Sequence, residues 1–218
     1  MPDPSDTGLI SFGSWTLRVR SAAASPARLL LLIHGRTGDE NSMWVFVREF
    51  AADYVVVAPR APHAARPAGH SWIAPESQRQ APIRIEDLRA SADALLAMVG
   101  EYAAAKGASS DQFDMIGFSE GAALAITLAL LHPERIGRMA VLAGFAPAGS
   151  DGLLRTSLLQ GKPVFVAHGT QDRLVPIEAS RESVRLLQRA GAQVTVCEAE
   201  IGHKVSAGCL HGLQSFFA

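Results

Sequence analysis

Cysteine is scarce in this chain of 218 residues, which contains only Cys197 and Cys209. Two cysteines are too few for the disulfide framework of a small secreted domain or for a four-cysteine zinc site. We therefore expect both to be ordinary buried thiols. The sequence also lacks an H-E-x-x-H motif, and His63 and His70 do not have the spacing of a metal-binding pair, so no metal ion is expected.

An excess of charge of either sign is also missing. The chain has 20 Lys+Arg and 21 Asp+Glu, a formal net charge of −1, so little attracts a nucleic acid and no such partner is expected. The apolar runs 29–33 and 122–131 fall far short of the ~20 residues that a membrane span requires. The N-terminal residues lack the positive and apolar regions of a secretory signal, which predicts a cytoplasmic protein without a membrane span.

Short aliphatic runs alternate with longer amphipathic stretches along the chain. Strands are predicted at Trp15–Val19, Leu29–His34, Tyr54–Ala58, Phe113–Gly117, Met139–Ala143, Val164–His168 and Val194–Glu198. Helices are predicted at about 40–52, 88–102, 119–132, 177–190 and 204–217. This alternation indicates an α/β fold with a mostly parallel central sheet and helices on both faces. Without a repeat or a linker, we expect one domain over residues 1–218.

Two connections between these elements bear on function. Residues 59–82 contain five prolines and no sustained periodicity, and a loop of this length is usually functional or disordered. We interpret it as a wall of the ligand site. Residues 144–162 leave room for a loop and a short helix around Leu153–Leu159, so no cap domain is expected.

The sharpest motif is a G-x-S-x-G sequence at residues 117–121, centred on Ser119. It follows a predicted strand and opens a predicted helix, so the serine is expected on a tight strand-to-helix turn with its hydroxyl above the sheet edge. We interpret Ser119 as a nucleophile. The alternative is a serine that caps the helix N-terminus.

A serine nucleophile needs a base and an acid that orients the base. In this turn geometry the order along the chain is serine, acid, histidine. Downstream aspartates are Asp151 and Asp172, and we favour Asp172 because it follows a predicted strand at the same sheet edge as Ser119; its alternative role is helix capping. Among the downstream histidines, His203 alone lies in a loop between the last strand and the last helix, and we interpret it as the base rather than as a structural histidine.

The anion formed by serine attack needs two hydrogen-bond donors. We expect the backbone N–H of Glu120, directly after the nucleophile, and the backbone N–H of Arg36, in the glycine-flanked loop after the strand Leu29–His34. The Arg36 side chain is expected in solvent and the Glu120 carboxylate at a helix N-terminus. Trp72 lies in the proline-rich loop, where it either covers an acyl pocket as a substrate-binding residue or belongs to the core.

Four segments, taken in order, resemble the motifs of one known family: residues 32–40 (LIHGRTGDE), 117–122 (GFSEGA), 168–176 (HGTQDRLVP) and 202–206 (GHKVS). This family is the phospholipase/carboxylesterase group of α/β-hydrolases, which contains acyl-protein thioesterases and small bacterial carboxylesterases. The resemblance covers roughly residues 28–217. It implies a cap-less α/β-hydrolase with the triad Ser119, Asp172 and His203, no cofactor and, in many members, a homodimer. Many members carry glutamine where this chain has Glu120.

The function expected from motif and resemblance together is that of a serine carboxylesterase. It would hydrolyse short-to-medium acyl esters, or thioesters, of small molecules through an acyl-enzyme intermediate. One alternative is a non-catalytic ligand-binding protein on the same scaffold. Another is a different triad enzyme, such as a peptidase, a lyase or a lysophospholipase.

Overall fold

The computed structural model describes residues 7–22, 27–49, 54–78, 82–106, 111–155 and 157–218. Its strands are β1 (Thr7–Phe12), β2 (Trp15–Arg20), β3 (Arg28–Ile33), β4 (Tyr54–Pro59), β5 (His63–Ala64), β6 (His70–Ser71), β7 (Phe113–Phe118), β8 (Ile136–Leu142), β9 (Pro163–Gly169) and β10 (Gln193–Ala199). Its α-helices are α1 (Ile85–Lys106), α2 (Glu120–Leu131), α3 (Ile177–Arg189) and α4 (Ala207–Phe217). The 3-10 helices are η1 (Trp44–Glu49), η2 (Pro133–Arg135) and η3 (Ser150–Leu153).

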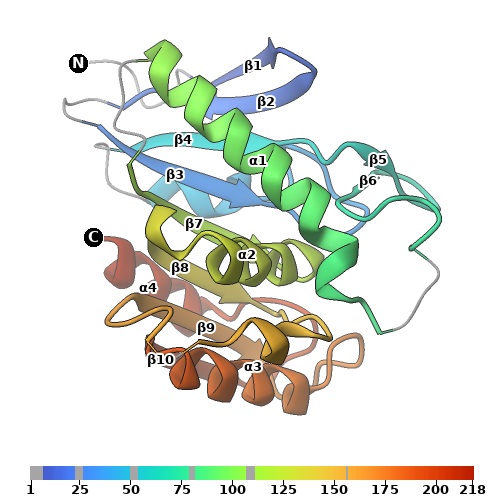
Figure 1. Cartoon of the computed structure of the whole chain (residues 1–218), viewed down its shortest axis with the longest axis vertical. Helices are drawn as coiled ribbons and strands as arrows, with labels where there is room; N and C mark the ends of the chain where they lie inside the picture. Colours follow the sequence, from blue (N-terminus) through green and yellow to red (C-terminus); the bar gives the residue numbers. More distant parts are fainter. Residues whose placement is uncertain (1–6, 23–26, 50–53, 79–81, 107–110, 156) are drawn as a thin grey trace.

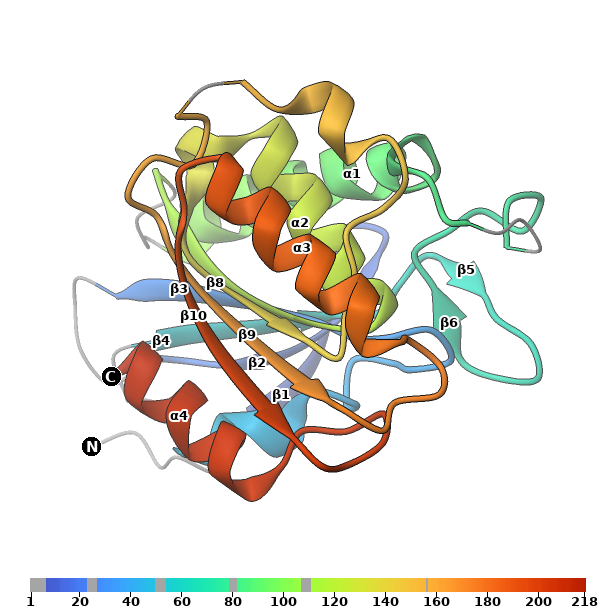
Figure 2. The same ribbon diagram turned by 90° about the horizontal axis from the view of Figure 1, so that it is seen from below.

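One twisted sheet organises the molecule, with the strand order β1-β2-β4-β3-β7-β8-β9-β10 (Figure 1). The pairs β1–β2 and β2–β4 are antiparallel, and the pairs from β4 through β3 to β10 are parallel. Helices α1, α2 and α3 lie on one face and α4 on the other (Figure 2). The expected α/β architecture is therefore confirmed.

The central strands are apolar because both of their faces are covered. Every residue of β4 is buried, and β3 is buried after its first residue. Helix α2 is buried along almost its whole length because α1 packs over it. Among the described residues, no helix combines the length and the apolar character needed to cross a bilayer.

All seven predicted strands are present, with ends shifted by a few residues. Strand β1 was not predicted: it is the antiparallel partner of β2 at the sheet edge, and none of its residues is fully buried. The predicted helix at 40–52 is a 3-10 helix over Trp44–Glu49, and residues 50–52 lie outside the described residues.

The prediction of a short helix around Leu153–Leu159 is wrong. The helical turn lies earlier, in η3, and Leu154 is already extended with φ −63° and ψ 123°. The backbone N–H of Leu159 donates to Ala190 O at 2.7 Å instead of to its own segment. This contact with the end of α3 replaces the hydrogen bonds of a continued helix.

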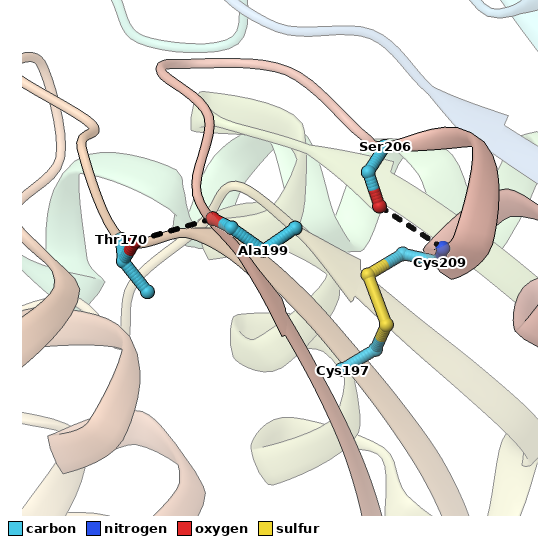
Figure 3. The surroundings of a disulfide bond; sticks show 5 residues. All are labelled: Thr170, Cys197, Ala199, Ser206 and Cys209. Atoms are coloured by element: carbon cyan, nitrogen blue, oxygen red, sulfur yellow. Dashed lines mark hydrogen bonds between the residues drawn. A yellow bond between two sulfur atoms is a disulfide. The ribbon is translucent and has the colours of Figure 1, made fainter.

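The expectation of two free thiols is also wrong, because Cys197 of β10 and Cys209 of α4 form a disulfide (Figure 3). Their Cα atoms are 5.7 Å apart. Side chains alternate between the two faces of a strand. Cys197 and Ala199 lie on the face of β10 that α4 covers. Cys209 is buried on the inner face of α4, so the two sulfur atoms meet at this contact.

Candidate active site

Ser119 lies on a strained turn between β7 and α2. Its backbone has φ 54° and ψ −116°, a region that non-glycine residues rarely adopt. The N–H of Ser119 donates to Leu142 O at 2.9 Å, which ties the turn to the end of β8. The Ser119 side chain makes no capping hydrogen bond to α2. The geometry therefore fits a half-buried serine on a strand-to-helix turn and not a helix cap.

The glycines on either side of Ser119 are required by close backbone contacts. A Cβ atom on Gly117 would lie 2.3 Å from Gly121 O, and one on Gly121 would lie 2.2 Å from Ile33 O. Any larger residue would force β7, α2 and β3 apart. This packing explains the local G-x-S-x-G sequence in physical terms.

His203 connects Ser119 with Asp172 by two hydrogen bonds. Its Nε2 lies 3.0 Å from Ser119 Oγ, and its Nδ1 lies 2.6 Å from Asp172 Oδ2. An aspartate accepts only, so Nδ1 carries the proton and Nε2 is free to accept the serine proton. Three residues from the loops after β7, β9 and β10 thus meet at one edge of the sheet, in the arrangement that the sequence predicts.

The Asp172 carboxylate is held by the turn that follows β9, and its side chain has 0% exposure. Burial would raise its pKa, but hydrogen bonds from the N–H of Val175, from His203 and from the N–H of Leu174 outweigh burial and lower the pKa below its usual value. The ionised Asp172 carboxylate therefore stabilises the folded protein at pH values above the unfolded-state pKa of about 3.9. This contribution to folding stability is lost as pH falls through the lower folded-state pKa. Asp172 therefore stays ionised near neutral pH.

Asp151 is not brought to His203. Its side chain is 70% exposed, and its Oδ1 lies 2.8 Å from the guanidinium of Arg189 on α3. The preference for Asp172 over Asp151 is thus supported by the positions of the two carboxylates.

None of the other downstream histidines takes the place of His203, although His168 Nε2 lies 3.5 Å from Asp172 Oδ2. His132 lies 3.1 Å from Asp93, and His211 lies on the exposed side of α4. His168 is buried, and its Nε2 donates to Val175 O at 2.9 Å, so it supports the turn after β9. Within the described ranges, no group of three or more His, Cys, Asp or Glu residues is arranged to hold a metal ion.

The loop after β3 lies opposite the nucleophile turn and is fixed by His34. The buried His34 ring donates from Nδ1 to Gly35 O at 2.7 Å and accepts the N–H of Ala61 at Nε2, at 3.0 Å. Burial lowers the pKa of His34, which favours this neutral form. In the part of the chain that the structure describes, the N–H groups of Arg36 and Glu120 donate to no protein acceptor. They are the two groups predicted to receive the anion.

The proline-rich loop contains the small hairpin of β5 and β6, which packs against the loop after β3. The N–H of Thr37 donates to His70 O at 2.9 Å, and the N–H of His70 donates to Gly38 O at 2.9 Å. A Cβ atom on Gly69 would lie 2.0 Å from Thr37 O, so the two loops touch through their backbones. Sequence reasoning missed both His34 and this hairpin; the one signal for His34 was its place at a strand end before a glycine.

The Glu120 carboxylate is buried, which the sequence did not indicate. It accepts the N–H of Trp72 at 2.7 Å and the hydroxyl of Ser71 at 2.9 Å. Burial raises its pKa, although these two bonds and the charge of Arg36 act in the opposite direction. The side chain thereby joins the nucleophile turn to the proline-rich loop.

Replacing Glu120 by Gln should raise the unfolding temperature at neutral pH and have little effect near pH 4. Because the folded-state pKa is raised, the stability that this group contributes is full below the unfolded-state pKa of about 4.3 and is lost as pH rises through the folded-state value. Glutamine keeps an acceptor for Trp72 without that loss. Calorimetry across this range measures the effect, and about 2–4 °C corresponds to 1 kcal/mol at this chain length. An equal gain at both ends of the pH range would contradict the explanation.

Trp72 belongs to the core, and its side chain has 0% exposure. Its Nε1–H donates to His34 O at 2.8 Å, and its ring centroid lies 5.1 Å from that of His34. Of the two interpretations of Trp72, the structure favours the core residue over the cover of an acyl pocket. Any influence of Trp72 on substrate would pass through the loop that carries Arg36.

A groove of about 460 Å³ opens beside His203. Its walls come from the loop after β3, from η1 and from the His203 loop, and its apolar side chains are Met43, Val45, Phe46, Phe118 and Val205. The ring of Phe118 lies 5.0 Å from that of His203. The groove can therefore hold an apolar group beside the His203 ring.

Known proteins share this sequence pattern and fold. The model of the Phospholipase/Carboxylesterase family matches residues 16–218. An acyl-protein thioesterase 1 of Kluyveromyces lactis is 26% identical over 194 residues, which cover 79% of this chain and 82% of that protein. A probable inactive carboxylesterase of Oryza sativa subsp. japonica is 35% identical over 107 residues, 49% of this chain and 43% of that protein. The crystal structure of a Bacillus cereus carboxylesterase superposes with a TM-score of 0.84 at 21% identity, covering 94% of each chain.

Proposed function

The chain belongs to the phospholipase/carboxylesterase family of α/β-hydrolases, and from this membership we propose that it is a serine carboxylesterase with Ser119, His203 and Asp172 as its catalytic triad. The observation that carries the proposal is the pair of hydrogen bonds that His203 makes, 3.0 Å to Ser119 Oγ and 2.6 Å to Asp172 Oδ2. A base within hydrogen-bond reach of a serine, and oriented by a carboxylate, is the arrangement that nucleophilic acyl transfer needs.

The first half of the reaction would form an acyl-enzyme. Ser119 Oγ attacks the ester carbonyl carbon while its proton passes to His203 Nε2. The Asp172 carboxylate stabilises the imidazolium that results. The carbonyl oxygen becomes an anion that accepts hydrogen bonds from the N–H groups of Arg36 and Glu120. As this anion collapses, the acyl C–O or C–S bond breaks and the imidazolium protonates the departing oxygen or sulfur, so an alcohol or thiol leaves and the acyl group remains on Ser119.

The second half repeats this chemistry with water as the nucleophile. His203 takes a proton from the water molecule, whose oxygen attacks the acyl carbonyl carbon. Collapse of the second anion returns the proton to Ser119 and releases the carboxylic acid. No metal ion or cofactor takes part in these steps.

A fluorophosphonate probe tests the proposal against a non-catalytic binding protein. The rice relative is named a probable inactive carboxylesterase, so the activity of this chain needs its own test. Intact-mass analysis should find one probe adduct, mapped by peptide sequencing to Ser119. A folded protein that takes up no probe and hydrolyses no ester would exclude a serine esterase, and cleavage of peptides but not esters would favour a peptidase.

Activity should fall in acid, because a protonated His203 cannot accept the serine proton. The Asp172 carboxylate, whose pKa is lowered, stays ionised near neutral pH and should add no change of its own there. Initial rates of p-nitrophenyl acetate hydrolysis between about pH 5 and pH 9 measure the profile.

Chelators provide the matching control for the pH experiment, because the proposed steps use no metal ion. Activity should be the same with and without EDTA. Strong inhibition that a divalent metal reverses would contradict this mechanism.

Short acyl esters should be cleaved faster than long ones. The groove beside His203 is about 460 Å³ and open, and the described residues between 144 and 162 contain only the short helix η3, with no cap that could enclose a long chain. We expect kcat/KM to be higher for acetate and butyrate esters than for palmitate, without activation at a lipid–water interface. A series of p-nitrophenyl esters with one matching thioester measures this preference.

The chain-length series also has an outcome that would reject the short-acyl proposal. A kcat/KM that rises steadily to palmitate would show that a long acyl chain finds a path that the groove does not reveal. The protein would then resemble the long-chain thioesterases of the family in its substrate.

Cytoplasmic location and dimer formation stay predictions. A disulfide persists most readily outside a reducing cytoplasm, so a stable Cys197–Cys209 bond in cells would argue against that location. Fractionation under thiol-trapping conditions tests the location, and light scattering after size-exclusion chromatography tests the dimer.

A further inference from the structure

The disulfide closes a short loop around His203. Cys197 and Cys209 are 12 positions apart, and His203 lies midway between them in the sequence. One cysteine is in β10 and the other in the first turn of α4 (Figure 3). The bond therefore joins the strand that precedes the His203 loop to the helix that follows it.

The first half of the His203 loop is held against the turn after β9. Gln171 N donates to Ile201 O at 3.0 Å, and a Cβ atom on Gly169 would lie 2.3 Å from both Ile201 O and Gly202 O. After His203, the backbone hydrogen bonds of the described residues stay within the loop and α4, as in the bond from Lys204 N to Gly202 O. The second half of the loop therefore depends on how the start of α4 is held.

The strand at the first end of the loop is an edge strand. Strand β10 pairs in parallel with β9 along all seven of its residues, and none of those residues is fully buried. At the loop junction, the hydroxyl of Thr170 donates to Ala199 O at 3.3 Å (Figure 3). The N–H of Thr170 donates to the same oxygen at 2.8 Å. These bonds fix where β10 ends but not where α4 begins.

The helix at the second end is anchored at its start by Cys209. The inner stripe of α4 consists of Cys209, Leu213 and Phe217, and the two residues before Cys209 are exposed. Ser206 caps the helix by accepting the N–H of Cys209 at 3.1 Å, a bond that is internal to α4. The disulfide is thus the covalent tie between the start of α4 and the sheet.

We propose that the Cys197–Cys209 disulfide positions His203 between Ser119 and Asp172, so that reduction of the bond lowers the catalytic rate constant while substrate binding is retained. This inference rests on the proposed role of His203 as the base. Proton transfer requires Ser119 Oγ and His203 Nε2 to stay within hydrogen-bond distance. A displacement of about 1 Å would break this contact and can lower the rate by up to ~10². The disulfide acts through His203 and does not touch the substrate.

The test compares oxidised and reduced enzyme. A water-soluble phosphine cleaves the S–S bond; it is oxidised to the phosphine oxide with oxygen from water, and the cysteines become two thiols. Titration should find no free thiol before reduction and two after it. We expect kcat for p-nitrophenyl butyrate to fall about tenfold and KM to change less than about twofold, with fluorophosphonate labelling slowed in parallel.

Two variants separate positioning from general stability. The double variant C197S/C209S should show the low kcat of the reduced enzyme and no response to phosphine. Glu198→Gln removes the 2.7 Å ion pair between Glu198 and Arg181 on the same edge strand but leaves the disulfide intact, so its kcat should match that of wild type. All rates are measured well below the unfolding temperature of each form, and reoxidation of the reduced wild type should restore activity.

The outcomes distinguish this inference from the proposed function. A reduced enzyme with two titratable thiols and an unchanged kcat would overturn the positioning role, even if its unfolding temperature falls. Two free thiols in the protein as purified without reductant would overturn the disulfide itself. A protein that hydrolyses no ester and takes up no fluorophosphonate in either form would overturn the proposed function, and with it the role given to His203.

Discussion

Replacing Ser119 by Ala should abolish nearly all ester hydrolysis and lower kcat by a factor on the order of 10⁴ to 10⁶. The substitution removes the Oγ atom that lies 3.0 Å from His203 Nε2, so no acyl-enzyme can form. The N–H groups of Arg36 and Glu120, which we propose to bind the anion, remain and should leave a small residual rate. Burst-phase and steady-state kinetics on p-nitrophenyl acetate measure the loss.

The fold should survive this substitution because alanine also fits the turn. Ser119 makes no capping hydrogen bond, and its N–H bond to Leu142 O belongs to the backbone. Circular dichroism and the unfolding temperature should therefore match those of wild type. Alanine at His203 should reduce the rate by a similar factor. A folded S119A protein with a tenth of the wild-type activity would reject Ser119 as the nucleophile.

The sequence predicts the triad because each member is marked by local constraints. Glycine is required on both sides of Ser119 because three backbone segments approach closely there. This requirement appears in the sequence as the G-x-S-x-G motif. Asp172 and His203 follow predicted strands, and parallel strands bring their carboxyl ends to one edge of the sheet. Chain order and topology therefore select these three residues as candidates for a triad, and the distances between them come only from the structure.

Features that depend on contacts between residues far apart in the chain could not be predicted from the sequence. Glu120 was expected at a solvated helix N-terminus, but Trp72 and Ser71, far earlier in the chain, enclose its carboxylate. The disulfide depends on which face of β10 is covered by α4, and residue pattern alone does not give that packing. For the same reason, the sequence left Trp72 undecided between core and pocket.

Replacing Asp172 by Asn should lower kcat by about 10⁴. The Asp172 carboxylate accepts the Nδ1–H of His203 at 2.6 Å and keeps the proton on that nitrogen. An amide can present its NH₂ group there instead, which favours the tautomer with the proton on Nε2, where it blocks acceptance of the serine proton. The lost negative charge also leaves the imidazolium without its partner. Single-turnover kinetics separates this effect from any change in binding.

Asp151→Asn is the matched control, because it makes the same change of charge on the other downstream aspartate. Asp151 is largely exposed and pairs with Arg189 at 2.8 Å, and a surface ion pair of this kind contributes about 0–1 kcal/mol to stability. Its kcat should stay within about twofold of wild type, because the carboxylate has no contact with the His203 ring. If Asp151→Asn abolished activity while Asp172→Asn did not, Asp151 would have to reach His203 in the working enzyme, and the assignment of the acid would be wrong.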